Sequence, residues 1–244
     1  MENKWDDLWS IVRDDFNDLS PSQRHKYRLM HRLFKKYGLS GTGFDIGCGN
    51  GATLCFLSTY CSQLYGIDSS SVAIRKTQQR LPQAVLFQNN IMTFDPADRE
   101  QCDVVTCVNV LEEVEDTNRV LSLMESLVKP GGHVCIVTQH SEKYRSKYDD
   151  FAGNIKRFEL SDLTHRIRST GFFIRSLKTW GFPLYTLYYS LTKLRNPRKV
   201  WSQRERGAAI LSSIIYKILI LDDLFDWCNR GRIIVALCQK TKAR

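Results

Sequence analysis

Short apolar runs alternate with helix-length segments along most of the chain after residue 43. The strand-like runs are Gly43–Ile46, Leu64–Ile67, Val85–Gln88, Val104–Val108, His133–Thr138, Phe172–Leu177 and Ile233–Cys238. The stretches between the early runs can each hold a helix, and this alternation is typical of a parallel sheet with helices on both faces. The last two runs can form an antiparallel end. We therefore predict an α/β fold with a doubly wound, seven-stranded, mostly parallel sheet.

Helical patterns lie at the start of the chain and before the last strand. Residues 5–37 have apolar positions at helical spacing, interrupted at Ser20-Pro21, where Ser20 is the predicted N-cap. Residues 181–230 are too long for a hairpin loop and predict a helical insertion. The predicted limits are 1–40 for an N-terminal helical cap, 41–180 for the α/β core, 181–230 for the insertion and 231–244 for the final strand.

The composition fits a globular α/β protein. The chain has 244 residues, of which 43% are hydrophobic and 25% charged. No secretory signal is visible at the N-terminus, and the longest apolar stretch, Ala208 to Leu221, is shorter than a membrane span. The eight cysteines include no Cys-x-x-Cys pair. We therefore expect reduced, structural thiols in a cytoplasmic protein, and no metal site.

The net charge of +9 is unevenly distributed. Residues 1–139 carry 14 Lys or Arg against 17 Asp or Glu, residues 140–206 carry 15 against 6, and residues 207–244 carry 6 against 3. The first 139 residues are thus close to neutral, and the basic excess follows them. This asymmetry concerns the partners of the protein rather than its fold.

A glycine-rich turn follows the first predicted strand. It reads Asp45-x-Gly47-x-Gly49-x-Gly51, and Asp68 ends the next strand, where its carboxylate can accept both hydroxyls of a ribose. Gly47-x-Gly49-x-x-Ala52 also satisfies a relaxed dinucleotide fingerprint, so the turn alone leaves that alternative open. Asp45 favours a cationic sulfonium ligand over a pyrophosphate.

Five motifs together resemble those of class I S-adenosylmethionine-dependent methyltransferases, and most closely the small-molecule branch that includes ubiquinone- and menaquinone-pathway enzymes. They are Asp45–Gly51, Asp68, Cys102–Val105, Val110–Asp116 and Leu127–Gly132, and they agree in order and spacing over residues 40–178. The resemblance implies a Rossmann-like core and S-adenosyl-L-methionine as methyl donor.

The resemblance also implies which residues would contact the methyl donor. Gly47, Cys48 and Gly49 would meet its methionine part, Asp68 its ribose, and Asn90 with Ile91 its adenine. Asn109 would line the floor of the site; Asp45 and Ser69 complete the predicted set. The family usually has an aspartate where Asn90 stands, although an amide oxygen can still accept a hydrogen bond from the adenine amino group.

Two histidines of the family pattern are absent. Glu113 replaces the histidine of Leu-Glu-His-Val, and Asn154 replaces that of Gly-His-x-Arg. A histidine is the usual base for a hydroxyl acceptor. The remaining candidates for catalysis are Glu113, His140 and Tyr144, while Glu113 has an equally good interpretation as part of a solvated acidic turn.

The basic segment 143–206 is also rich in aromatic residues. It predicts a lid over an apolar acceptor, either alone or with added contact to an anionic membrane; a packed helical hairpin whose charges are only solvated stays an alternative. Nucleic acid is disfavoured because no RNA- or DNA-binding module is present. We predict methyl transfer from S-adenosylmethionine to a small apolar or aromatic metabolite by direct displacement. The alternatives are a non-catalytic S-adenosylmethionine-binding or scaffold protein and, less favoured, an RNA methyltransferase or an NAD-dependent oxidoreductase.

Overall fold

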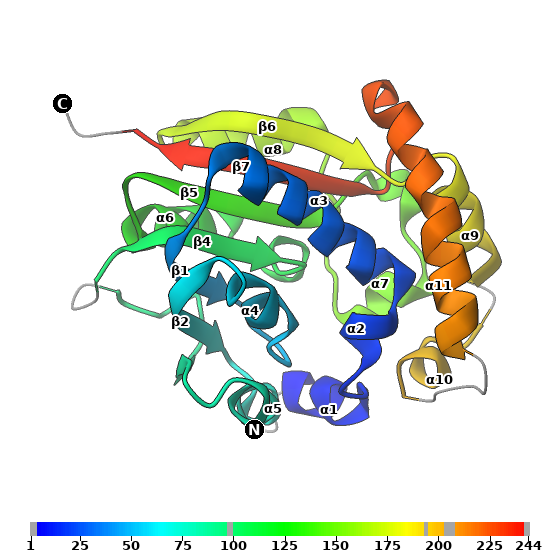
Figure 1. Ribbon diagram of the computed structural model, residues 1–244, viewed down its shortest axis with the longest axis horizontal. Coiled ribbons are helices and arrows are strands. Elements are labelled where there is room, and N and C mark those ends of the chain that lie inside the picture. Colours follow the sequence, from blue (N-terminus) through cyan, green and yellow to red (C-terminus); the bar gives the residue numbers. More distant parts are fainter. Residues whose placement is uncertain (1–3, 97–99, 193–194, 203–207, 242–244) are drawn as a thin grey trace.

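The computed structural model describes residues 4–96, 100–192, 195–202 and 208–241. A single seven-stranded sheet has the strand order β3-β2-β1-β4-β5-β7-β6, in which β7 runs antiparallel to both of its neighbours (Figure 1). The strands are β1 Gly41–Ile46, β2 Cys61–Asp68, β3 Val85–Gln88, β4 Cys102–Val108, β5 Val128–Gln139, β6 Phe172–Trp180 and β7 Ile233–Lys240. All seven predicted strands and the antiparallel end are confirmed.

Helices cover both faces of the sheet and gather at one end of it. The α-helices are α1 Lys4–Ile11, α2 Phe16–Leu19, α3 Pro21–Tyr37, α4 Ala52–Leu57, α5 Ser71–Arg80, α6 Thr117–Leu127, α7 Lys147–Ala152, α8 Leu160–Ser169, α9 Leu184–Thr192, α10 Pro197–Ser202 and α11 Ala208–Leu219. Three 3₁₀ segments are η1 Leu111–Glu113, η2 Glu142–Tyr144 and η3 Ile220–Cys228. The insertion before the last strand is helical, as predicted.

Successive side chains of a strand point to opposite faces of the sheet, so the two faces carry two separate hydrophobic cores. In β7, Ile234 and Ala236 join the core that contains α6 and α8, whereas Val235 and Leu237 join the core that contains α3 and α4. A strand buried on both faces needs an unbroken apolar run, because each face must contact a helical layer. This explains why the central strands show little polar alternation.

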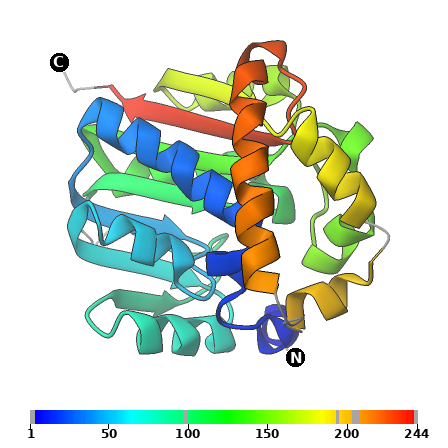
Figure 2. The same cartoon turned by 45° about the vertical axis from the view of Figure 1, so that its right-hand side comes forward.

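The carboxyl ends of the parallel strands point toward the helices added to the core. In Figures 1 and 2, α1, α2, α7 and the insertion α9–α11 lie beyond the arrowheads of β1 and β4. Helix α3 begins at this end with Pro21 at its first position; Ser20 precedes it as predicted, but its side chain makes no capping bond to the helix. In open α/β sheets ligands bind at the carboxyl ends of the strands, so these helices cover the expected site.

Candidate active site

The glycine turn after β1 brings its main chain close to the sheet edge. Gly47 and Gly49 have positive φ angles of 69° and 53°. The amides of Gly47 and Cys48 both donate to the carbonyl of Ile67, at 2.8 and 2.9 Å. A Cβ at Gly47 would lie 2.3 Å from Cγ2 of Val110. Glycine is needed here both for its φ angle and for this close approach.

Asp68 at the end of β2 ties the turn to helix α5. Its Oδ2 accepts from the Gly49 amide and its Oδ1 from the Ser70 amide, both at 2.9 Å. Ser70 in turn caps α5 by accepting from the Ala73 amide. Burial raises the pKa of Asp68 above its ordinary value, although these amide hydrogen bonds oppose the effect. The carboxylate is therefore oriented by its neighbours and lines the cavity.

Asp45 lies beneath the turn rather than in the wall of the cavity. Its Oδ1 accepts from the Thr106 hydroxyl at 2.6 Å, while its Oδ2 is buried and has no hydrogen-bond partner among the described residues. Burial raises its pKa well above the ordinary value. A buried carboxylate with one unpaired oxygen favours either a bound proton or a nearby positive charge.

The N-terminal helix packs directly over the glycine turn. The ring of Trp9 is so close to Gly49 that a Cβ added to that glycine would lie 2.4 Å from it. Asp6 of the same helix accepts from the Ser70 hydroxyl at 2.6 Å and from the Val72 amide at 3.2 Å. These contacts hold α1 against the start of α5. Neither Asp6 nor Trp9 was identified from the sequence, since the partners of both lie at least 40 residues away.

A cavity of about 870 Å³ lies between the sheet edge and the covering helices. We call its two parts the glycine-turn end and the tyrosine end. The glycine-turn end is lined by Gly47, Cys48, Asp68, Ser69, Asn90 and Ile91. The tyrosine end is lined by Lys26, Gln139, Tyr148, Tyr185, Tyr188 and Tyr189. Asn109, Val110, Glu112 and Glu113 lie along the wall that joins them.

A buried lysine lies at the junction of the two ends. The Nζ of Lys26 donates to Oδ1 of Asn109 at 2.7 Å, and Gln139 donates to the same oxygen at 3.4 Å. The Lys26 side chain is only 3% exposed, and burial lowers its pKa from 10.5 to about 8. Asn109 adopts a φ of 58°, a conformation that asparagine tolerates better than most residues.

Two carboxyl groups accompany Lys26 in this wall. The Oε2 of Glu112 accepts from the Thr138 hydroxyl at 2.6 Å, while its Oε1 is buried without a partner among the described residues. Burial raises the pKa of Glu112, and the charges of Lys26 and Arg157 oppose that shift. Burial also raises the pKa of Glu113, well above its ordinary value, with the Glu112 charge adding to it. This wall can therefore both donate and accept protons.

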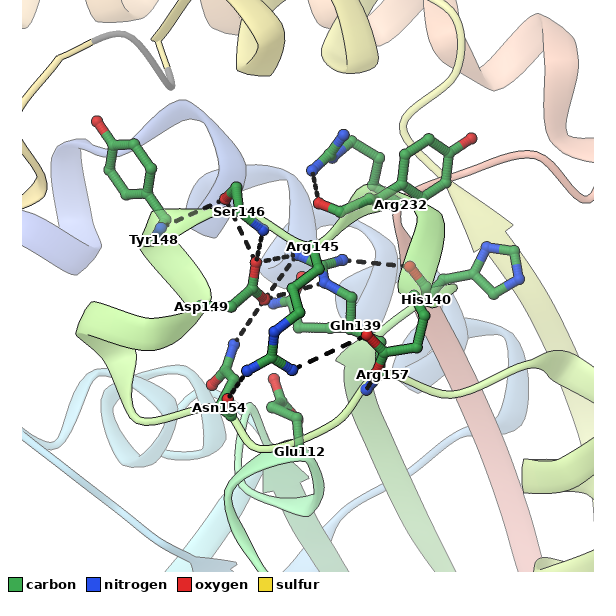
Figure 3. Close-up of polar contacts among 12 residues, drawn as sticks. Glu112, Gln139, His140, Arg145, Ser146, Tyr148, Asp149, Asn154, Arg157 and Arg232 are labelled. Atoms are coloured by element: carbon green, nitrogen blue, oxygen red, sulfur yellow. Dashed lines mark hydrogen bonds and ion pairs between the residues drawn. The ribbon is translucent and has the colours of Figure 1, made fainter.

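A fully buried ion pair supports the tyrosine end from below (Figure 3). The guanidinium of Arg157 binds the carboxylate of Asp149 with contacts of 2.8 to 3.1 Å, and donates to the main-chain oxygen of His140 at 3.2 Å. Burial acts to raise the pKa of Asp149, but the Arg157 hydrogen bonds and charge lower it overall. Asp149 also closes the capping box of α7 with Ser146. The pair thus joins α7 to the end of β5.

Aromatic side chains close the cavity between the N-terminus and the insertion. Trp201 of α10 lies 5.2 Å from the ring of Phe16 and 5.3 Å from that of Phe151, and its carbonyl accepts from the Arg13 amide. Arg232 stacks over Tyr189 at 3.9 Å. Segments nearly 190 residues apart in the chain therefore meet over the same cavity.

The structure separates the predicted site residues into three groups. Those that line the cavity are Gly47, Cys48, Asp68, Ser69, Asn90, Ile91, Asn109 and Glu113. Asp45 supports the turn from behind and Gly49 is covered by Trp9, so neither residue is among those that line the cavity. His140 and Tyr144 are not among the lining residues. Within the described residues, no group of three or more His, Cys, Asp or Glu is arranged to hold a metal ion.

His140 and Tyr144 face the final strand instead of the cavity. Nδ1 of His140 donates to the Gly231 carbonyl at 2.5 Å, its Nε2 lies 3.7 Å from Glu159, and its ring points away from the Arg157 network in Figure 3. Burial lowers the pKa of His140. The Tyr144 hydroxyl donates to the Arg230 carbonyl at 2.6 Å. These positions indicate structural roles and do not support the prediction that either residue acts on the ligand.

Lys26, Glu112 and the Arg157–Asp149 pair are the polar groups that sequence reasoning missed. Lys26 lies on a helix that read as an ordinary amphipathic cap, and only its approach to Asn109, 83 residues away, distinguishes it. Glu112 had a local signal, because it belongs to the Val110–Asp116 motif. The sequence alone does not distinguish Glu112 from the neighbouring Glu113.

Comparison with known proteins agrees with this geometry. Residues 44–134 match the family described as methyltransferase domain. The chain is 32% identical over 143 residues to a ubiquinone biosynthesis O-methyltransferase of Vibrio cholerae, which covers 57% of this chain and 56% of the relative. A protein of the same name from Aeromonas salmonicida is 36% identical over 135 residues, or 53% and 56% of the two chains. The chain thus spans little more than half the length of these curated relatives.

Solved structures show the same fold at low identity. The N-methyltransferase NodS from Bradyrhizobium japonicum, in complex with S-adenosyl-L-homocysteine, superposes with a TM-score of 0.63 at 17% identity and covers 98% of this chain and 99% of its own. Phosphoethanolamine N-methyltransferase 2 of Haemonchus contortus, in complex with S-adenosyl-L-methionine, superposes with a TM-score of 0.61 at 17% identity. The superposition covers 91% of this chain and 54% of that protein. The [4+2]-cyclase SpnF superposes with a TM-score of 0.62 at 16% identity, over 91% of this chain and 84% of its own.

Proposed function

We propose that this chain, whose core is a class I S-adenosylmethionine-dependent methyltransferase domain, transfers a methyl group to a small acceptor bound at the tyrosine end of the cavity. The observation that carries the proposal is the junction of the two ends: a glycine turn with Asp68 on one side and a buried Lys26–Asn109 contact beside Glu112 on the other. The family match and the fold of the solved neighbours support the methyl donor.

The glycine-turn end fits S-adenosyl-L-methionine in shape and charge. Asp68 would hold the ribose hydroxyls, Asn90 and Ile91 the adenine, and the main chain of Gly47 and Cys48 the methionine part. Burial raises the pKa of Asp45 beneath the turn, and a cationic ligand above it would favour the charged form of this carboxyl group. When bound, the donor supplies an electrophilic methyl group. The residues of this chain hold it in place and exclude water around it.

The tyrosine end suits an apolar or aromatic acceptor with one polar group. Tyr185, Tyr188 and Tyr189 offer ring faces, while Lys26 and Glu112 lie where those rings meet the other end. A hydroxyl or amine between them would accept a hydrogen bond from Nζ of Lys26 and donate one to Oε1 of Glu112. Glu112 would then take the proton lost by the acceptor. Alignment and desolvation would supply most of the rate enhancement.

The proposal includes a cytoplasmic location with peripheral attachment to an anionic membrane. All eight cysteines are free and six of them are buried, which supports a reducing compartment. Within the described residues, no helix is both long and apolar enough to cross a bilayer. Peripheral contact is the mode that fits a basic, aromatic insertion.

Titration calorimetry and isotope transfer test the function. We expect S-adenosylmethionine and its demethylated product to bind and NADH not to bind. Incubation of a cell extract with isotopically labelled donor and the protein should give a new labelled small molecule in mass spectrometry. A parallel sample with Glu112→Gln should give much less of it, with donor affinity retained. Binding of NADH alone would overturn the donor assignment, and donor binding without any labelled product would favour the non-catalytic alternative. Label found in RNA would favour the RNA methyltransferase.

A further inference from the structure

Helix α11 and the following η3 segment present a row of large apolar side chains to solvent. The row consists of Ile210, Leu211, Ile214, Ile218, Leu221, Leu224 and Trp227, and we call it the apolar ridge. The exposed fraction of these residues ranges from 50% for Ile218 to 80% for Trp227. A contiguous set of this kind is unusual on the surface of a soluble domain, where such residues normally occur singly.

The opposite face of α11 is fully used for packing inside the molecule. Ser212 donates to the Leu19 carbonyl, Ser213 accepts from Arg24 at 3.3 Å, and the Tyr216 ring packs against that of His25 in a tilted arrangement with 4.4 Å between ring centroids. In Figures 1 and 2, α11 lies between the start of α3 and α9, and it contacts both helices. The apolar ridge is therefore the face that remains after the fold is complete.

Two acidic residues of η3, Asp222 and Asp223, are directed into the protein. Asp222 accepts from the amides of Leu184 and Tyr185, both at 2.8 Å, and so caps α9. Asp223 is held by Arg28 and Arg32 at 2.6 and 2.7 Å. Asp222 is thus held by two main-chain amides and Asp223 by two arginines, so both carboxylates are engaged inside the fold.

Exposed basic residues lie within the ridge and at its two ends. Lys217 projects from α11 itself, Arg230 follows η3, and Arg198 with Lys199 lies on α10, which meets the start of α11 in both ribbon views. Across residues 184–230 the sequence has eight Lys or Arg against four Asp or Glu. An apolar strip flanked by cations, with a tryptophan near one end, is the pattern of a segment that lies in a lipid headgroup layer.

We propose that the apolar ridge docks the protein on the surface of an anionic lipid bilayer. Anionic headgroups would pair with Lys217, Arg198 and Lys199 while the apolar side chains enter the acyl boundary. A second copy of the chain would bring the same cations against one another, which disfavours the ridge as a dimer interface.

The ridge also lies next to the cavity through helix α9. Tyr185, Tyr188 and Tyr189 of this helix line the tyrosine end, whereas Leu187 and Leu191 are about 60% exposed on its outer side. A protein docked through the ridge would hold its tyrosine end beside the bilayer, where an apolar acceptor dissolved in lipid is concentrated. This consequence rests on the proposed function; the docking itself does not.

Vesicle co-sedimentation tests the docking without any methyl transfer. We expect the full chain to bind vesicles of phosphatidylcholine with 30% phosphatidylglycerol, and to bind pure phosphatidylcholine about tenfold more weakly or worse. Ile214→Ser/Ile218→Ser should weaken binding to the anionic vesicles by about tenfold or more, because two half-exposed side chains lose their apolar contact. Lys217→Glu should weaken it about fivefold, and added salt should abolish that difference.

Phe173→Ser is the matched control. Phe173 is 57% exposed on β6, outside the ridge, so its loss should leave vesicle binding unchanged. Thermal unfolding of every variant separates docking from folding. Equal vesicle binding by the wild type and the double variant would overturn the proposal. So would a stable dimer in solution that the double variant dissociates while neither protein binds vesicles. Donor affinity, measured separately, shows whether the proposed function fails independently.

Discussion

The glycine-turn end and the tyrosine end of the cavity are assembled in different ways. At the glycine-turn end, main-chain groups and one carboxylate dominate, and Gly49 and Asp68 are only 19 residues apart. At the tyrosine end, side chains dominate, and residues from α3, β5, α7 and α9 meet across more than 160 positions of sequence. A ligand site made by a local backbone motif can keep its geometry while the other side of the same cavity is rebuilt.

The largest expected effect is on stability, at the tyrosine end. Arg157→Met leaves the Asp149 carboxylate buried without its partner, which typically costs about 3–5 kcal/mol of unfolding free energy. Urea unfolding measures it. Arg166→Met, which removes a partly exposed pair with Asp162, is the matched control and should cost less than about 1 kcal/mol. If the two ends are separable, the folded fraction of Arg157→Met keeps its donor affinity within about twofold; a tenfold loss would contradict the comparison.

Asp68→Asn should affect the glycine-turn end alone. The amide retains the shape of the carboxylate but cannot accept from the Gly49 and Ser70 amides with both of its polar atoms. We expect donor affinity to fall about 100-fold, equivalent to about 2.7 kcal/mol. Calorimetry with S-adenosylmethionine is the measurement, and Asp18→Asn, in an exposed pair with Arg80, is the control. Unchanged donor affinity in Asp68→Asn would remove the basis for distinguishing the two ends.

Lys26 makes stability depend on pH at the junction. Its pKa is about 8 in the folded protein, where burial disfavours the ammonium, and 10.5 as an ordinary lysine. Unfolding therefore takes up a proton between these values, so the stability tied to Lys26 rises as the pH rises through 8. From pH 7.5 to 9.5 the gain is about 2 kcal/mol.

Urea unfolding of the wild type and of Lys26→Met at both pH values, under reducing conditions, isolates this contribution. The variant should lack the gain, because methionine carries no proton. An equal change in both proteins would show that the ammonium is solvated, and that the tyrosine end is open to water.

The smallest expected effect concerns the cover of the glycine-turn end. Trp9→Ala removes the ring that packs on Gly49 while leaving the Asp6 contacts of α1 in place. We expect about a fivefold loss of donor affinity, close to 1 kcal/mol. Trp227→Ala, at an 80% exposed position of the apolar ridge, is a control of equal size and should leave donor affinity unchanged. A loss of 100-fold for Trp9→Ala would make α1 a full part of the donor site rather than its cover.

Sequence reasoning succeeded where contacts are local. All seven strands follow from apolar runs. Asp68 and Asn109, which the family resemblance implies as donor contacts, line the cavity, and their contact with the donor stays a prediction. It failed for His140, whose position after β5 suggested the cavity; an antiparallel β7 places the Gly231 carbonyl beside its ring instead. It also missed Lys26, because its partner Asn109 lies 83 residues away. It missed the Arg157–Asp149 pair as well, because these residues are only eight apart but the chain between them leaves helix α7, so no helical spacing relates them. The limits proposed for the cap, core and insertion stay predictions.

The burial of the thiols gives the protein two natural labelling positions. Six cysteines lie in the cores; burial raises the pKa of Cys61 and Cys102 to about 11 and that of Cys238 to about 12, so they are poor nucleophiles at neutral pH. Cys55 and Cys228 are only half-buried. Cys55 lies on α4, directly after the glycine turn, and Cys228 follows Trp227 at the end of the apolar ridge. A maleimide dye would therefore attach first at these two positions, and one doubly labelled molecule could report donor binding and lipid docking together.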